Sequence, residues 1–136
     1  MLTQTKEHEQ EDKPVFAFSG EYMGGHKMYP KKTDVDVELF SNFMLIKWGR
    51  IHKHQIVIRY NQITELENQD EKRITKTRIL LTGIIVGLLW KKKFLYTVIE
   101  YNDEANLKQA IVIDFHRKAE QAQQAIYQKM TEVNSK

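Results

Sequence analysis

The feature that most constrains the fold is a series of short segments in which apolar and polar residues alternate. In residues 33–40, Val35, Val37 and Leu39 alternate with carboxylates. Successive side chains of a strand point to opposite faces, so this pattern predicts a half-buried β-strand. Two further alternating segments follow before residue 61, each preceded by turn residues. Short strands with a turn about every ten residues predict an antiparallel meander.

Further strands are predicted on both sides of this meander. Residues 15–25 are rich in aromatic residues and end at a Gly-Gly pair, which predicts a first strand, or a segment leading into one, that ends in a bend favouring glycine. Residues 61–69 predict another short strand. Residues 94–116 predict a β-hairpin, because two alternating segments flank a polar turn at residues 102–106.

The C-terminal end changes period and predicts an amphipathic helix. Apolar residues recur there at intervals of three and four, which places them in one stripe along a helix. They are Ala119, Ala122, Ile126, Met130 and Val133. Asp114 lies just upstream, where its carboxylate is available to cap the start of this helical region near His116.

Together these elements predict a mainly β (α+β) fold, an antiparallel sheet of about six or seven strands followed by one C-terminal helix. A sheet of this size must protect its edges. Closing into a bent, partly open barrel capped by the helix does this and buries the helix stripe. We expect a disordered, polar segment over residues 1–14 and a single domain over residues 15–136.

Composition narrows the compartment and the chemistry. The chain has no cysteine, which excludes disulfides and thiolate metal sites and fits a reducing compartment. The N-terminus has no basic-then-apolar leader, so we expect a cytoplasmic location. The net charge is +3, and residues 1–14 hold two basic residues against four acidic ones, which leaves +5 for the remainder.

Motifs for catalysis are not evident in the sequence. It contains no glycine-rich phosphate loop, no nucleophile elbow around a serine and no His-Glu-x-x-His sequence. We therefore expect no enzymatic activity and no cofactor.

Two groups of residues are candidate metal ligands. Asp34, Asp36 and Glu38 share one face of their predicted strand, where a weak cation site competes with an ordinary solvated face. His52 and His54 are two residues apart and would project to the same side of a strand, with His26 as a third ligand if it lay nearby. We favour the reading without a metal in both cases.

Nucleic-acid binding is not expected, although the pI is near 9.0. Stacking on bases requires aromatic side chains that are exposed beside cations. Trp48, Tyr60 and Tyr96 fall at alternating strand positions, which is typical of core residues, and Trp90 is the fourth candidate.

The most hydrophobic part of the chain is residues 79–90, twelve residues without a charge. A helix of this length covers only about 18 Å, whereas a membrane span needs about 20 residues. We therefore expect no transmembrane helix here. The isoleucines and valine favour a strand, and the length and leucine content allow a helix.

Two interpretations of this region remain open: a buried crossover that packs on the barrel, or an exposed apolar patch ringed by cations. In the second, lysines and arginines would attract an anionic lipid surface, and apolar side chains would insert into it. The residues of this candidate site are Lys72, Arg73, Lys76, Arg78, Leu80, Ile84, Leu88, Trp90, Lys91, Lys92 and Lys93.

The order of these segments resembles the bacterial pleckstrin-homology-like (PH-like) domains, over roughly residues 20–131. Tyr22, Gly24, Gly25 and His26 match a Tyr-x-Gly-Gly-His segment that opens the first strand in that family, and residues 60–63 match a Tyr-x-x-Ile bend. The chain departs from the pattern at Lys27, where the family pattern would place proline. The resemblance implies a seven-stranded bent barrel closed by a C-terminal helix, in a superfold whose members bind phosphoinositides, peptides or proteins.

These observations predict a non-enzymatic PH-like binding module. The first hypothesis is peripheral association with an anionic membrane surface, at the inner face of the membrane, through residues 72–93. The alternative is a protein-interaction or self-association module, in which a protein partner or a second copy of the chain meets the apolar patch or an open sheet edge.

Overall fold

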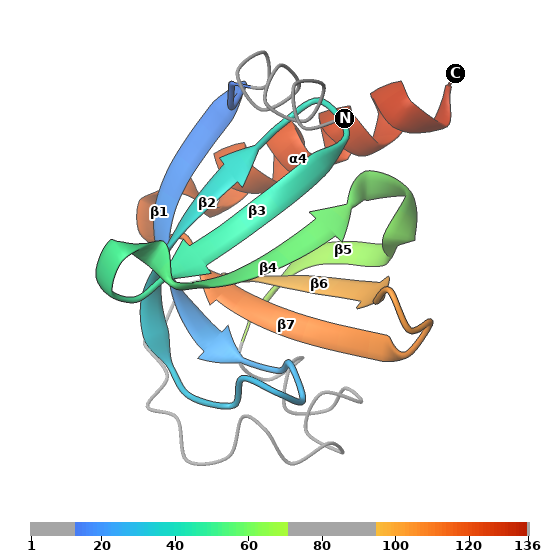
Figure 1. Cartoon of the computed structure of the whole chain (residues 1–136). Coiled ribbons are helices and arrows are strands. Elements are labelled where there is room, and N and C mark those ends of the chain that lie inside the picture. The colour runs from blue at the N-terminus through green and yellow to red at the C-terminus, as the bar shows by residue number, and fades with distance from the viewer. Residues whose placement is uncertain (1–12, 71–94, 136) are drawn as a thin grey trace.

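Residues 13–70 and 95–135, which the computed structural model describes, form a single antiparallel sheet followed by one α-helix (Figure 1). The strands are β1 (Phe16–Gly24), β2 (Thr33–Leu39), β3 (Phe43–Trp48), β4 (His54–Arg59), β5 (Ile63–Gln69), β6 (Tyr96–Asn102) and β7 (Lys108–Asp114). The helix is α4 (Ala119–Asn134), and the short 3-10 helices are η1 (Arg50–His52), η2 (Tyr60–Gln62) and η3 (His116–Lys118).

The strand order is β4-β3-β2-β1-β7-β6-β5, so β1 joins two halves of the sheet and β4 and β5 form its edges. The β1–β7 register shifts between Tyr22 and Gly24, and such a bulge bends a strand. Figure 1 shows the consequence, because β2, β3 and β4 run across the direction of β6 and β7. The prediction of a mainly β, partly open barrel of about seven antiparallel strands with one C-terminal helix is confirmed.

The core lies between the two halves of the sheet, and the alternation read from the sequence accounts for it. On β2, the side chains of Val35, Val37 and Leu39 are buried, and the intervening carboxylates point outward. The same inward face continues across the neighbouring strands, where Val37 pairs with Ile46 and Ile46 with Ile56.

Helix α4 covers one end of the barrel and packs on η2, β5 and β6. The predicted stripe is confirmed: Ala119, Ala122 and Ile126 are buried, while Met130 and Val133 pack half-buried against the core. The expected cap is not formed, because the N-cap residues of η3 and α4 are Phe115 and Lys118 and neither has a side-chain cap hydrogen bond. Asp114 Oδ1 instead accepts the backbone N–H of His116 at 2.8 Å, at the chain reversal that leads into η3.

Two local expectations were wrong. His52 belongs to η1 and not to a strand, so the strand geometry that would align it with His54 is not formed. Tyr22 and Gly24 end β1 instead of opening it. On the helix, Lys129 is buried beside the apolar stripe.

Several expectations fall outside the described residues. They include the disordered segment, apart from the exposed Lys13 and Pro14, and every residue of the predicted membrane or partner site. Those residues are Lys72, Arg73, Lys76, Arg78, Leu80, Ile84, Leu88, Trp90, Lys91, Lys92 and Lys93. In residues 13–70 and 95–135, no helix has the length and apolar character needed to span a membrane.

Candidate binding surface at the loop end of the barrel

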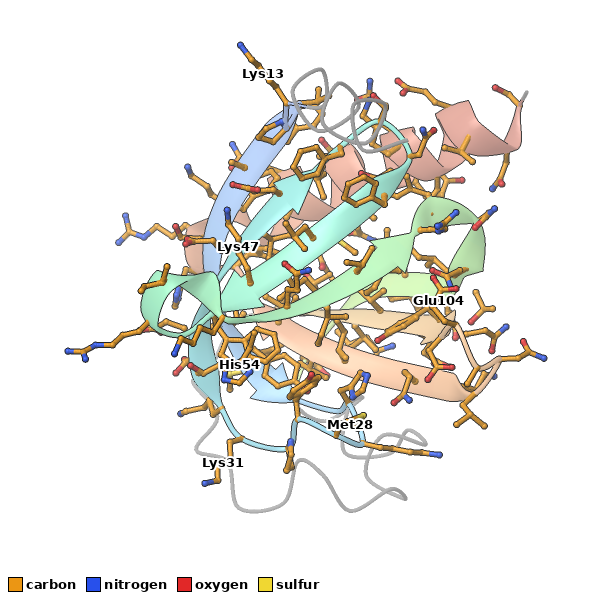
Figure 2. The ribbon with its side chains drawn as sticks, viewed as in Figure 1. Lys13, Met28, Lys31, Lys47, His54 and Glu104 are labelled. Atoms are coloured by element: carbon orange, nitrogen blue, oxygen red, sulfur yellow. The ribbon has the colours of Figure 1, made fainter. Side chains whose placement is uncertain are left out.

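The end of the β1–β4 meander opposite to α4 carries the β1–β2 loop (residues 25–32) and the β3–β4 loop (residues 49–53). In an antiparallel meander, alternate loops lie at the same end, so these two loops are neighbours. We call them together the loop end. Figure 2 shows Met28, Lys31 and His54 near this end of the molecule, whereas Lys13 lies at the other end.

An aromatic cluster closes the barrel at the loop end. The ring of Trp48 on β3 stacks with Tyr22 of β1 at a centroid distance of 6.1 Å and with His54 of β4 at 5.6 Å. Tyr29 meets Trp48 edge-on at 5.0 Å. Each favourable aromatic pair contributes about 0.5–1.5 kcal/mol beyond its buried area, so the cluster fixes the β1–β2 loop against the strands.

The hydroxyl of Tyr22 ties the β1–β2 loop to its own strand. It donates to the carbonyl oxygen of Tyr29 and accepts the backbone N–H of His26 at 2.9 Å. His26 Nδ1 in turn accepts the backbone N–H of Met28 at 3.0 Å. The imidazole is 8% exposed, so this acceptor is shielded from water.

The β6–β7 turn supports the same loop from the side. Asp103 Oδ1 accepts the N–H groups of Ala105 and Leu107, each at 2.9 Å. Its Oδ2 accepts from Gln109 Nε2 at 2.9 Å, and Gln109 Oε1 accepts the backbone N–H of Lys27 at 3.2 Å. A chain of hydrogen bonds therefore runs from the turn to the β1–β2 loop.

The pKa values of the loop-end groups follow from this packing. Burial raises the pKa of Tyr22 to about 12, so its hydroxyl stays protonated. Burial lowers the pKa of His26, and the nearby Asp103 carboxylate opposes that shift. The pKa of Asp103 is lowered chiefly by its hydrogen bonds from Gln109 and the Leu107 amide. His26 is therefore neutral near pH 7, with Nδ1 free of a proton.

Two large apolar side chains project from the loop end. Met28 is 73% exposed and Ile51 is 89% exposed. Ile51 has a φ of 59°, a left-handed conformation that is a genuine outlier for a β-branched residue. Such strain costs on the order of 1–3 kcal/mol and is typical of functional sites.

Cations surround both of these apolar side chains. Lys27, Lys31 and Lys32 share the loop with Met28, while Arg50 and Lys53 flank Ile51. All five are exposed. A recess of about 510 Å³ lies between the loop and the strand ends. It is lined by Met28, Tyr29, Pro30, Lys31, Lys32, Thr33, Trp48 and His54. This combination of exposed apolar tips and cations is chemically suited to an anionic interface.

Residues 13–70 and 95–135 hold no cluster of three or more potential ligands for a metal. Asp34, Asp36 and Glu38 lie on the outer face of β2, and Glu38 Oε2 lies 3.0 Å from Lys47 Nζ.

One imidazole lies close to a buried carboxylate beside η3. His116 Nδ1 lies 3.5 Å from the buried Asp114 Oδ2, and a groove beside it is also lined by Ser19. The Ser19 hydroxyl, however, donates to Asp36 Oδ1 at 3.4 Å. Ser19 and His116 therefore do not form a nucleophile–base pair of the hydrolase type.

Most of the aromatic residues that are candidates for stacking on nucleic-acid bases are not free to do so. Tyr60 and Tyr96 are buried, and Trp48 stands between Tyr22 and His54. Trp90 lies outside the described residues.

Sequence reasoning placed the candidate site at residues 72–93 and missed the loop end. A signal was nevertheless present, because apolar residues stand among cations in both "HKMYPKK" at residues 26–32 and "RIHK" at residues 50–53. The pattern is too short for hydropathy to detect, and its meaning depends on the strand pairing that brings the two loops together.

Comparison with known proteins yields a likeness of fold alone. No protein-family description matches the sequence, and no curated protein matches it. Among solved structures, the fold is similar to that of the C-terminal domain of an unknown protein from Leishmania infantum, with a TM-score of 0.55 and 10% sequence identity. The match covers 96% of this chain and 94% of that chain.

Proposed function

We propose that the chain is a non-enzymatic binding module of the PH-like type that associates peripherally with an anionic membrane surface. The observation that carries the proposal is Ile51, which is held in a strained backbone conformation and is 89% exposed among cations. Holding a β-branched residue in a strained conformation while its side chain is exposed to water does not stabilise the fold. Insertion of this side chain into a lipid interface would bury it and offset the cost of the strain.

The energetics of the loop end favour such a role. Burying an isoleucine or methionine side chain contributes about 1.5–3 kcal/mol. Each lysine or arginine near an anionic leaflet adds about 1 kcal/mol, decaying within a Debye length. Two apolar tips and five cations therefore provide enough attraction for reversible association.

The basic and apolar residues of 72–93 provide a second candidate contact, which rests on sequence alone. They join β5 to β6, and Gln69 and Tyr96 at the two strand ends are paired. The two candidate contacts can be separated experimentally because they lie in different segments of the chain.

The first test is co-sedimentation of the full chain with neutral vesicles and with vesicles containing phosphatidylserine, at low and moderate salt. Wild-type protein is expected to bind only the anionic vesicles, and the binding should weaken as the Debye length falls. The double variant Lys31→Glu/Lys32→Glu should lose most of it. Lys13→Glu/Lys118→Glu, which makes the same charge change at two exposed residues away from the loop end, should lose little.

The triple variant Lys91→Glu/Lys92→Glu/Lys93→Glu tests the other contact. If this variant alone abolishes binding, residues 72–93 form the site and the loop end does not. Absence of binding to anionic vesicles in every condition would overturn the membrane proposal itself.

A second candidate function, self-association or strand addition, is favoured by the open edge at β4. The Tyr60 N–H bonds to Asn42 O at 3.5 Å, and alternation in an antiparallel ladder then directs the backbone groups of Gln55 and Val57 away from β3. The side chain of Val57 is 42% exposed.

This edge is also partly protected, which is why the second function ranks lower. Gln62 Oε1 accepts the Arg59 N–H at 2.7 Å, and β4 is short, as is typical of edges that resist pairing. Light scattering across a concentration series tests self-association directly. Dimers that Val57→Lys abolishes would favour the second function, and a monomer at all concentrations would exclude self-association through β4.

A further inference from the structure

His26 is a titratable residue that is buried at the loop end and bonded to the backbone of the β1–β2 loop. Its imidazole is buried and lies 5.1 Å from the Tyr29 ring. Its Nδ1 holds the N–H of Met28, the residue that carries the exposed apolar side chain of this loop. A neutral imidazole can accept this hydrogen bond, whereas a protonated one presents a donor to a donor.

The groups that face His26 decide what protonation would do. On β1, the Tyr22 hydroxyl accepts the His26 N–H, and burial raises the pKa of Tyr22 to about 12, so this group is neutral. On the loop, the Tyr29 ring lies 5.1 Å from the imidazole. Lys27, the next residue along, is exposed. From the β6–β7 turn, the Asp103 carboxylate acts on His26 and attracts an imidazolium.

We propose that His26 is a pH-sensitive latch that holds the β1–β2 loop closed when neutral and loosens it when protonated, which strengthens association with an anionic membrane. This inference rests on the proposed function. The Met28 side chain is already 73% exposed, so loosening does not uncover it but frees the loop that carries it to reach into the lipid interface. Protonation also adds one positive charge beside Lys27, so both effects act in the same direction.

The pH range follows from the direction of the shift. The pKa of His26 in the folded protein lies below its ordinary value of 6.5. Stability from the neutral latch is therefore complete above pH 6.5 and declines as the pH falls through the folded pKa. The transition therefore lies below pH 6.5.

The test compares His26→Asn with His116→Asn. The Asn side-chain oxygen can occupy the position of Nδ1 and accept the Met28 N–H at every pH, so His26→Asn keeps the latch closed. His116 is an exposed imidazole outside the loop end, so His116→Asn also removes one imidazole but leaves the latch intact.

Hydrogen exchange of the Met28 amide is measured first, without vesicles, and expressed as protection relative to the unfolded chain. Between about pH 7.5 and pH 5.0, wild type and His116→Asn are expected to lose protection by up to about tenfold, as expected for one lost hydrogen bond. His26→Asn should keep its protection. Unchanged protection in the wild type would overturn the latch.

Co-sedimentation with phosphatidylserine vesicles at the same two pH values is the second measurement. Acidification should increase binding by about fivefold or more in the wild type and in His116→Asn, and less in His26→Asn. If the Met28 amide opens with acid but no vesicle is bound at either pH, the latch stands and the proposed membrane function falls. If His26→Asn responds to pH as strongly as the wild type, the membrane role of the latch is overturned.

Discussion

The buried hydroxyl of Tyr22 donates a hydrogen bond to the backbone carbonyl of Tyr29, seven residues further along the chain. The same oxygen accepts the N–H of His26, so one side chain organises both ends of the turn that presents Met28. The shape of the loop end therefore depends on a side chain in the core of the barrel.

Replacing Tyr22 with phenylalanine should remove both hydrogen bonds without changing the ring. We expect a loss of about 1–3 kcal/mol in the free energy of unfolding, because two buried backbone groups lose their partner. Urea denaturation measures this loss, and hydrogen exchange should show a less protected His26 amide.

Tyr60→Phe is the control for that variant. Its hydroxyl donates to Phe40 O at 2.8 Å, away from the loop end. It should lower stability by a similar amount and leave the His26 amide protected. Equal protection of His26 in both variants would contradict the role given to Tyr22.

Gly25 should not tolerate alanine. It has a φ of 118°, and an added Cβ would collide with the backbone carbonyl of Ala110 on β7. Because neither backbone can move without breaking the sheet, we expect Gly25→Ala to cost at least about 3 kcal/mol. Gly49→Ala is the milder comparison, since its φ of 88° is also unfavourable but the nearest atom belongs to the exposed side chain of His54. Thermal unfolding of both variants checks the order.

Lys129 offers a test of the helix–barrel contact. Its side chain is 10% exposed, and its Nζ lies 3.0 Å from Glu132 Oε1. The Glu132 side chain is 47% exposed, so only the Lys129 end of this pair is buried. A well-packed apolar residue can replace a buried charged side chain at little or no cost, whereas leaving that charge unpaired is destabilising. Lys129→Met should therefore be as stable as the wild type or more so, and Glu132→Gln should be less stable. A marked loss of stability in Lys129→Met would show that the ion pair itself is needed.

Asp103 should contribute to stability only while it is ionised. Its folded-state pKa lies below the ordinary value of 3.8, so the contribution is present above pH 3.8 and is lost as the pH falls through the folded pKa. Asp103→Asn should be less stable than the wild type at pH 7, and the difference should shrink below about pH 3.8. Urea denaturation from pH 7 to acid measures this convergence, and a constant difference would contradict it.

Most of the strands could be predicted because burial on one face of a sheet leaves a period of two in the sequence. Val35, Val37 and Leu39 illustrate this, and the stripe through Ile126 does the same for the helix. Such local patterns define elements without reference to distant residues. The overall barrel followed from the need to cover sheet edges and the helix stripe.

The loop end could not be predicted because long-range contacts determine it. Nothing local places Trp48 between Tyr22 and His54 or brings Gln109 against Lys27. The strained conformation of Ile51 also depends on how η1 joins β3 to β4. Hydropathy instead indicates a candidate contact around residues 79–90, because apolar residues are consecutive there.

The most direct test of the proposed function measures stability and membrane binding of Ile51→Asn together. Asparagine tolerates a positive φ, so the variant should gain about 1 kcal/mol in the free energy of unfolding. The same change removes an apolar tip, so affinity for phosphatidylserine vesicles should fall by about tenfold or more. Tyr127→Gln on α4 is the control, because Tyr127 is 63% exposed at the far end and should leave binding unchanged. Higher stability with weaker binding would support a loop end shaped for the membrane, and wild-type affinity in Ile51→Asn would contradict it.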